Sequence, residues 1–523
     1  MLNNFPFYLI LIIIILLLIM LGNKIKVAYP VMLVLAGLVI SFIPGLPTLH
    51  IESELIFIIF LPPLLYDAAW HISWKELWRW RRVIGSFAFL VVFFTALAVA
   101  LTVNYFIPGF SLPLGFLLGG IVSPPDAVSA GAILKFVKVP RRVSSILEGE
   151  SLLNDASSLI IFRFALIAVG TGSFVWHEAA ITLVWMLIGG IGIGLIIGYI
   201  FMKCHKYLPT DANIDIVLTL VTPYIMYIAA EEAHSSGVLA VVSGGLFLSN
   251  RRLLFLSSTS RLHGLNVWES ICFVLNGLVF MFIGLDLPQI TAGLDGVSIT
   301  TAIGYGILVT VVLIVARILS SIAAVLVTLI ARNFITVADA NPGFKLPFLM
   351  GWSGMRGVVS LAAALSIPVY LADGSAFPQR NLILFITFIV ILATLLLQGL
   401  TLPYIIRKLN LADPDHVAPQ EEVYNDLKKQ LARHALQHLT TNYSQQLNRQ
   451  PVLQQIASKW QVSDHSTDGV LMTEESRAIY LDLLNLQRKW LISKNKADGD
   501  IDEEIIRKHL LFLDLEEEKL QFI

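Results

Sequence analysis

Thirteen long apolar segments run between residues 5 and 406, and they limit the chain to folds that sit in a lipid bilayer. A helix that crosses the hydrocarbon core needs about 20 mainly apolar residues. The first segment lacks the basic start and the small-residue cleavage site of a signal peptide, so we expect it to be a span. The expected spans are 5–22, 27–46, 51–70, 83–105, 112–134, 143–170, 178–202, 214–230, 235–249, 268–287, 297–330, 346–371 and 381–406.

The composition agrees with a bilayer environment. Of the 523 residues, 56% are hydrophobic and 14% are charged, whereas soluble proteins carry about 25% charged residues. This composition excludes a disordered chain, a collagen-like repeat and a nucleic-acid-binding protein. The two cysteines, Cys204 and Cys272, are too few for a disulfide framework.

Basic residues alternate between successive loops and therefore predict the orientation. One set of alternate loops contains 17 Lys and Arg, and the other set contains one, Arg380. Because cytoplasmic loops are enriched in Lys and Arg, we expect the N-terminus outside and the C-terminus in the cytoplasm.

The charge balance divides the chain into two domains. Residues 1–412 contain 23 Lys and Arg against 18 Asp and Glu, while residues 413–523 contain 13 against 19. The acidic tail has Leu and Ile at helical spacing over 421–439 and 500–522. We expect a helical cytoplasmic tail that regulates the membrane domain or mediates oligomerisation.

Ionisable residues within the apolar segments need a reason, because each costs about 2.5–3.5 kcal/mol at the bilayer centre on insertion scales. They either form buried ion pairs between helices or line an ion pathway, and the sequence leaves both readings open for the arginines. The candidates within the spans are Asp67, Asp126, Glu148, Glu150, Asp155, Arg163, Arg317 and Arg356.

The sixth span holds the densest group of oxygen ligands. On a helix, Ser151 and Asp155 share one face, and Glu150 and Asn154 lie beside them. Hydroxyl, amide and carboxylate oxygens are hard donors that suit an alkali cation, and no Cys or His is near enough to suggest zinc or copper. The pattern predicts a cation site.

The fifth and twelfth spans are predicted to be interrupted helices. Pro124 and Pro125 precede Asp126 in the fifth span, and a proline in a helix removes a backbone donor. Gly351–Gly357 interrupts the twelfth span around Arg356. If spans 1–6 and 8–13 are inverted repeats, the two interruptions correspond, as at the midplane site of a transporter. Asp126 and Arg356 would then balance the opposed helix dipoles where the broken ends cross.

These motifs resemble the cation:proton antiporter superfamily, in particular its electroneutral Na⁺/H⁺ exchanger branch of prokaryotic type. The resemblance covers about residues 1–410 and not the tail. It is carried by Phe60–Asp67, Ser123–Ser129, Gly149–Asp155, Glu232–Gly237, Phe280–Gly284 and Gly354–Gly357.

The resemblance implies an all-α membrane protein that forms a homodimer. It assigns spans 1–3 and 7–10 to a dimerisation domain and spans 4–6 and 11–13 to a mobile core. It implies no cofactor and no catalytic residues, because the protein would be a transporter and not an enzyme.

Site residues follow from the same resemblance. Asp155 is implied to bind the cation and the proton, with Asn154, Ser151 and Asp67 beside it. Glu150 and Arg356 would form an ion pair that stabilises the core, and Asp126 would lie where the broken helices cross. The alkali cation itself would be held by Asp155, Ser151 and Asp67.

The resemblance also bears on stoichiometry and on ion preference. Electrogenic members have Asp in place of Asn154 and typically Lys in place of Arg356, so this chain is expected to exchange one Na⁺ or Li⁺ for one H⁺. Many relatives have Thr-Asp-Pro where this chain has Pro125-Asp126-Ala127, so a threonine ligand is missing.

Other functions remain as alternatives. A K⁺/H⁺ antiporter would use the same residues, since selectivity depends on cavity size and ligand geometry. A cation channel would use the same oxygen-rich lining but would conduct current. A membrane-embedded enzyme fits less well, because the spans contain no Ser/His pair and no His/Glu metal cluster. The short loops favour a bacterial inner membrane.

Overall fold

The computed structural model describes most of the membrane domain and part of the tail. The residues described are 5–25, 27–43, 53–134, 137, 139–172, 176–294, 297–333, 343–371, 373–411, 420–451, 453–455, 457–458, 474–497, 512–513, 515–517 and 519. The chain separates into two compact units, Met1–Asp413 and Pro414–Ile523.

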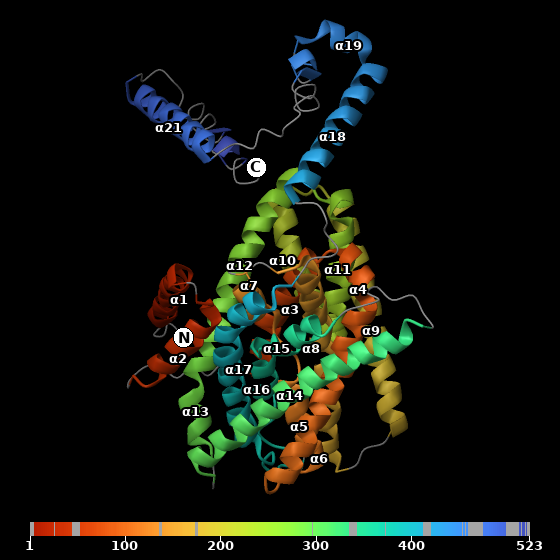
Figure 1. Cartoon of the computed structure of the whole chain (residues 1–523), viewed down its shortest axis with the longest axis vertical. Helices are drawn as coiled ribbons and strands as arrows, with labels where there is room; N and C mark the ends of the chain where they lie inside the picture. Colours follow the sequence, from red (N-terminus) through yellow and green to blue (C-terminus); the bar gives the residue numbers. More distant parts are fainter. Residues whose placement is uncertain are drawn as a thin grey trace. The chain divides into compact units, whose positions relative to one another are not determined.

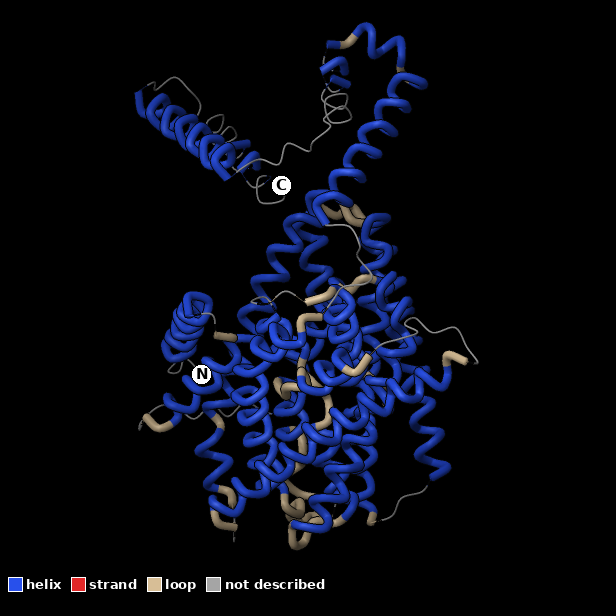
Figure 2. Tube along the Cα trace, viewed as in Figure 1, coloured by secondary structure: helices blue, strands red, loops and turns tan. Residues whose placement is uncertain are grey.

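The described residues are helical apart from connecting loops and one isolated β-bridge between Tyr370 and Ala376 (Figure 2). The elements of the first unit, labelled in Figure 1 except for η2, are α1 (Phe5–Ile25), α2 (Tyr29–Ser41), α3 (Ser53–His71), α4 (Trp74–Gly85), η2 (Ser86–Val91), α5 (Val92–Phe106), α6 (Leu112–Val122), α7 (Ala127–Leu134), α8 (Arg141–Thr171), α9 (Trp176–Tyr207), α10 (Ala212–Glu232), α11 (Gly237–Phe255), α12 (Ser258–Leu285), α13 (Leu287–Ala292), α14 (Ile299–Ala331), α15 (Lys345–Trp352), α16 (Val358–Leu365) and α17 (Arg380–Leu409).

Within the part of the chain that the structure describes, nine helices are long and apolar enough to cross a membrane. This confirms an all-helical integral membrane protein. The other predicted spans fall on α2, α3, and the interrupted pairs α6–α7 and α15–α16. The total of thirteen spans and the inverted repeat stay predictions.

Both predicted interruptions are present. Residues 123–126 separate α6 from α7, as expected where two prolines follow one another. Residues 353–357 separate α15 from α16, and three of the five residues there are Ser353, Gly354 and Gly357. The two breaks leave helix ends inside the protein, where their backbone groups need partners.

Helix α8 packs against neighbours on several sides. Gly120 of α6 lies so close to it that a Cβ there would be 2.9 Å from the backbone nitrogen of Phe162. On another side Leu152 and Ala156 belong to one buried apolar cluster with Tyr66 of α3 and Val238 of α11. These contacts fix the polar face of α8 within the protein.

The tail unit contains α18 (Gln420–Asn442), α19 (Ser444–Arg449) and α21 (Glu474–Ala497). The first of these covers the helix expected at 421–439. Most of the helix expected at 500–522 lies outside the described residues. Helix α21 was not anticipated from the sequence.

Candidate functional site

The two broken helices meet through backbone atoms and two charged side chains. The Asp126 amide donates to the Met355 carbonyl oxygen at 2.8 Å, which joins one break to the other. The Asp126 carboxylate accepts from the Val128 amide at 3.0 Å and from the Ser129 amide and hydroxyl at 3.3 and 2.5 Å. Asp126 therefore caps the N-terminus of α7, where a negative charge is favoured.

Arg356 serves the opposite kind of helix end. Its guanidinium donates to the carbonyl oxygens of Val122, the last residue of α6, and of Gly354 in the other break. Its backbone amide donates to the Thr394 hydroxyl of α17 at 3.2 Å. The side chain is fully buried. A cation at the C-terminal end of α6 balances the helix dipole there.

The polar face of α8 lies against the first break. Asn154 Nδ2 donates to the Pro125 carbonyl oxygen at 3.2 Å, and the Ser151 hydroxyl donates to the same oxygen at 3.4 Å. That oxygen is available because the Ser129 amide, its partner in a continuous helix, bonds to Asp126 instead. The Asn154 Oδ1 atom is buried and has no hydrogen-bond partner among the described residues.

Asp155 differs from Asp126 in how its carboxylate is surrounded. It is 6% exposed, and no hydrogen bond to its carboxylate is found in the described part of the chain. Its backbone oxygen accepts from the Ser158 hydroxyl at 3.0 Å. Asp126 is near enough to interact with it electrostatically. Asp155 is thus a buried carboxylate for which the described residues supply no hydrogen-bond donor.

Asp67 is not brought into contact with Asp155 by any described interaction. Its carboxylate lies 3.2 Å from Nδ1 of His71, one turn further along α3. It also lies near the thiol of Cys272 in α12. Helix α3 packs beside α8 in the same apolar cluster, but the structure places Asp67 with α3 and α12 partners.

Glu150 forms its ion pair with Arg317, and not with Arg356 as the resemblance implied. Glu150 Oε1 accepts from Arg317 Nη2 of α14 at 2.7 Å, and both side chains are almost completely buried. Arg356 is close enough to act on Glu150 electrostatically, but its guanidinium is taken up by the carbonyl oxygens at the breaks. The carbonyl oxygens of Val122 and Gly354, which the breaks leave without helical partners, accept from Arg356 instead. Arg317 of α14 is therefore the residue that pairs with Glu150.

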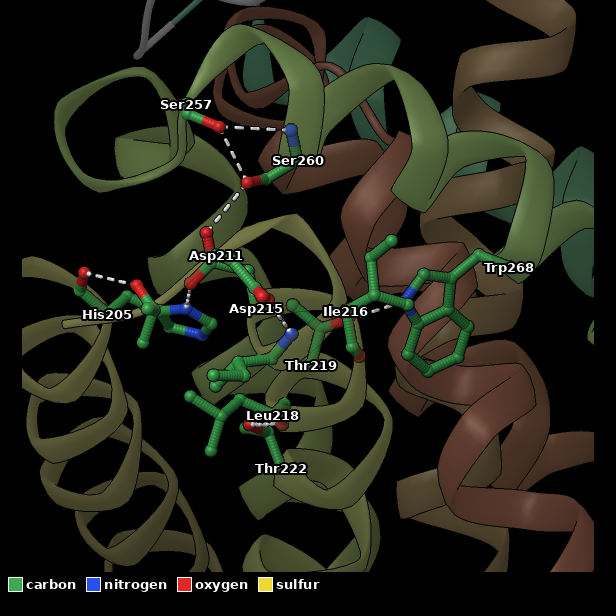
Figure 3. Close-up of polar contacts among 12 residues, drawn as sticks. His205, Asp211, Asp215, Ile216, Leu218, Thr219, Thr222, Ser257, Ser260 and Trp268 are labelled. Carbon is green, nitrogen blue, oxygen red and sulfur yellow. Dashed lines mark hydrogen bonds and ion pairs between the residues drawn. The ribbon is translucent and has the colours of Figure 1, made fainter. Parts of the chain in front are cut away.

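A second buried polar cluster was missed in the sequence. His205 Nδ1 of α9 lies 2.8 Å from Asp215 Oδ1 of α10, and the Ser260 hydroxyl of α12 donates to Asp215 Oδ2 at 2.7 Å (Figure 3). The Ser257 hydroxyl lies 2.7 Å from that of Ser260. His205, Asp215 and Ser260 come from α9, α10 and α12, so this cluster joins three helix ends. Its one signal in the sequence was an acid at the start of the eighth apolar segment.

The donors around Asp155 suit an alkali cation and not a transition metal. Carboxylate, amide and hydroxyl oxygens of Asp155, Asn154 and Ser151 come from one face of α8, and the Pro125 carbonyl faces them from the break. The described residues contain no group of three or more His, Cys, Asp or Glu side chains arranged to hold a metal ion.

The sequence matches one protein family over most of its length. The family model described as "Sodium/hydrogen exchanger, transmembrane" matches residues 10–408. The chain is 34% identical over 423 residues to a sodium, potassium, lithium and rubidium/H⁺ antiporter of Bacillus pumilus. That match covers 78% of this chain and 62% of the relative, so the chain spans less than two thirds of the relative's length.

Other matches cover a larger share of the protein that is compared. The Na⁺/H⁺ antiporter ApNhaP of Aphanothece halophytica is 32% identical, with 92% of this chain and 88% of that protein covered. Among solved structures, the sodium proton antiporter MjNhaP1 of Methanocaldococcus jannaschii at pH 8 superposes with a TM-score of 0.62 at 18% identity. The superposition covers 78% of this chain and 99% of that one, so the two share a fold.

Proposed function

The chain belongs to the sodium/hydrogen exchanger family, and on that premise we propose that it exchanges Na⁺ or Li⁺ for H⁺ across a membrane, one for one. The observation that carries the proposal is the contrast between two neighbouring carboxylates. Asp126 is held by three protein donors, whereas Asp155 is buried with no described hydrogen bond to its carboxylate. A carboxylate without a fixed partner can bind a proton at one time and a cation at another.

Competition for Asp155 couples the two ions. A buried carboxylate that carries neither ion is a bare charge in a medium of low dielectric constant, which is unfavourable. A proton or a partly dehydrated cation removes that cost, so the site moves across the barrier only when it is loaded. Asn154 is neutral and contributes no second titrating carboxylate, which makes the exchange electroneutral.

The remaining site residues have supporting roles. Asn154 and Ser151 orient α8 against Pro125 and supply oxygen atoms near Asp155. Asp126 and Arg356 hold the ends of the broken helices together at the crossing. Asp67 of α3 is proposed as a further contact of the cation.

The architecture that goes with this function is also a proposal. Thirteen spans would form inverted six-helix repeats, with spans 1–3 and 7–10 dimerising and spans 4–6 and 11–13 moving as the core. The protein would act as a homodimer in a bacterial inner membrane, N-terminus outside and the tail of residues 413–523 in the cytoplasm. No cofactor takes part.

Exchange in proteoliposomes tests the function. Proteoliposomes are prepared with an acidic interior and a trapped pH dye. The membrane voltage is clamped at each of several values, and Na⁺, Li⁺ or K⁺ is added outside. We expect alkalinisation with Na⁺ or Li⁺ at a rate that does not change with voltage. A current carried by the cation would instead identify a channel, and silence with all three ions in folded protein would refute the proposal.

K⁺/H⁺ exchange is the second candidate, since the Bacillus pumilus relative is named for potassium and rubidium as well as sodium and lithium. Pro125 stands where many relatives have a threonine ligand, so backbone oxygens would replace a hydroxyl in the shell. Alkalinisation by K⁺ alone would move the assignment to this candidate.

A further inference from the structure

We propose that Arg163 and Glu231 form a gate that closes the outer approach to Asp155 and must open during each exchange cycle. The pair joins α8 to α10, with an Arg163 Nη2 atom donating to Glu231 Oε2. Neither residue belongs to the cation site. The inference rests on the proposed exchange, in which α8 moves as part of the core and α10 stays with the dimerisation domain.

Arg163 lies on the same side of α8 as the cation site. Asp155, Leu159 and Arg163 follow one another at four-residue spacing, so they stack on one helical face. Eight residues of helix put Arg163 about 12 Å beyond Asp155 along the axis. Helix α8 begins beside a loop predicted to be cytoplasmic, so Arg163 lies on the outer side.

Glu231 is held firmly by its own domain. Its Oε1 accepts from the backbone amide of Gly237, at the start of α11, at 3.0 Å. A Cβ at Gly237 would lie 2.9 Å from that Oε1, so glycine permits this approach. The tight turn between α10 and α11 has His234 at a φ of 52° and is tied to α9, whose Trp185 Nε1 donates to the Ala233 oxygen at 3.1 Å.

Arg163 is held less tightly, since its described polar contact is with Glu231. The Glu231 carboxylate is therefore held in place by its own domain. Arg163 is a long, flexible side chain on α8, the helix that moves in the proposed exchange. The side chains are 36% and 31% exposed, so water can reach the pair and its energy is that of a partly screened ion pair. Such a contact can break and re-form within a transport cycle.

The test measures sidedness of access with single cysteines. In a background of Cys204→Ser and Cys272→Ser, Leu159→Cys reports on the outer approach and Glu148→Cys reports on the inner one. A membrane-impermeant maleimide is added to right-side-out or inside-out vesicles. The gate variants are Arg163→Gln, Glu231→Gln and the exchanged pair Arg163→Glu with Glu231→Arg.

We expect either neutral variant to raise outer labelling of Leu159→Cys by about 1.5- to 5-fold, the range for a partly exposed ion pair. Inner labelling of Glu148→Cys should not rise, whereas general loosening of the fold would raise both. The exchanged pair should return outer labelling toward its starting rate. Unchanged outer labelling in both neutral variants, or equal increases on both sides, would overturn the gate.

The outcome is separable from that of the proposed function. If Asp155→Asn still exchanges Na⁺ for H⁺, the function assigned to Asp155 fails, whatever the labelling shows. If that variant is inactive but labelling does not respond to Arg163 or Glu231, the gate alone fails.

Discussion

The carboxylates of Asp126, Asp155 and Asp215 are of two kinds: those that accept hydrogen bonds from protein groups, and one, Asp155, that we propose binds a transported ion. Asp126 and Asp215 are carboxylates in the described part of the membrane domain that accept hydrogen bonds from protein donors. Asp155 is buried, as Asp215 is, yet its carboxylate has no such donor among the described residues. A buried carboxylate without donors is costly. The presence of Asp155 in α8 is explained if a cation or a proton occupies its carboxylate during transport.

The buried pair of Glu150 and Arg317 leads to a prediction about stability. Arg317→Met should destabilise the protein by about 3–5 kcal/mol, because Glu150 would be left as an uncompensated buried charge. The double variant Arg317→Met with Glu150→Gln should recover part of that loss, since residue 150 would no longer carry a buried charge that has lost its Arg317 partner. The temperature at which each variant aggregates in detergent compares the stabilities of the single and the double variant. A single variant as stable as the native protein would contradict the assigned role.

Proton competition at Asp155 predicts how cation affinity depends on pH. The apparent KM for Na⁺ should rise as pH falls, because protons and Na⁺ exclude each other from one carboxylate, while the maximal rate at saturating Na⁺ changes little. Initial rates of dye alkalinisation at several pH values give both constants. A KM that is independent of pH would show that the two ions bind at separate sites.

At the scale of elements, the crossing of α6–α7 with α15–α16 organises the site. The break in α6–α7 exposes the Pro125 oxygen to Asn154 and Ser151, and the break in α15–α16 lets Gly357 approach Asp126. The position of each break could be predicted, because proline and glycine act on the residues next to them. The partner of Glu150 could not, because it depends on which distant helix lies beside α8.

The close approach at the crossing gives a prediction for Gly357. A Cβ at that position would overlap the Asp126 carboxylate. Gly357→Ala should therefore force the two breaks apart and reduce exchange at least tenfold. Gly131→Ala is the matched control, since a Cβ there meets nothing within 4 Å. Equal activity of the two variants in liposomes would argue against the crossing as the support of the site.

At the scale of the whole molecule, the distribution of basic loops predicts sidedness, which the fold alone does not reveal. The 17 Lys and Arg on one set of loops predict that the end of α17 is cytoplasmic and the end of α8 is outside. The helical class and the broken spans followed from the sequence. The polar cluster of His205, Asp215 and Ser260 did not, because its members come from three separate helix ends.

Reporter fusions check this sidedness. Green fluorescent protein fused after Leu409 should fluoresce, because it folds in the cytoplasm, and alkaline phosphatase fused after Thr171 should be active outside. The reciprocal fusions serve as controls and should be silent. Fluorescence after Thr171 would invert the orientation and place the proposed gate on the cytoplasmic side.

The central claim is that Asp155 carries both ions, and exchange by Asp155→Asn tests it most directly. The variant keeps the shape of the side chain and removes its charge, so the protein should fold and elute as the native protein does. Asp215→Asn is the control, since it neutralises a buried carboxylate that is already satisfied by His205 and Ser260. We expect Na⁺-driven alkalinisation to be lost in Asp155→Asn and kept in Asp215→Asn. Undiminished Na⁺-driven proton movement in folded Asp155→Asn would contradict the account.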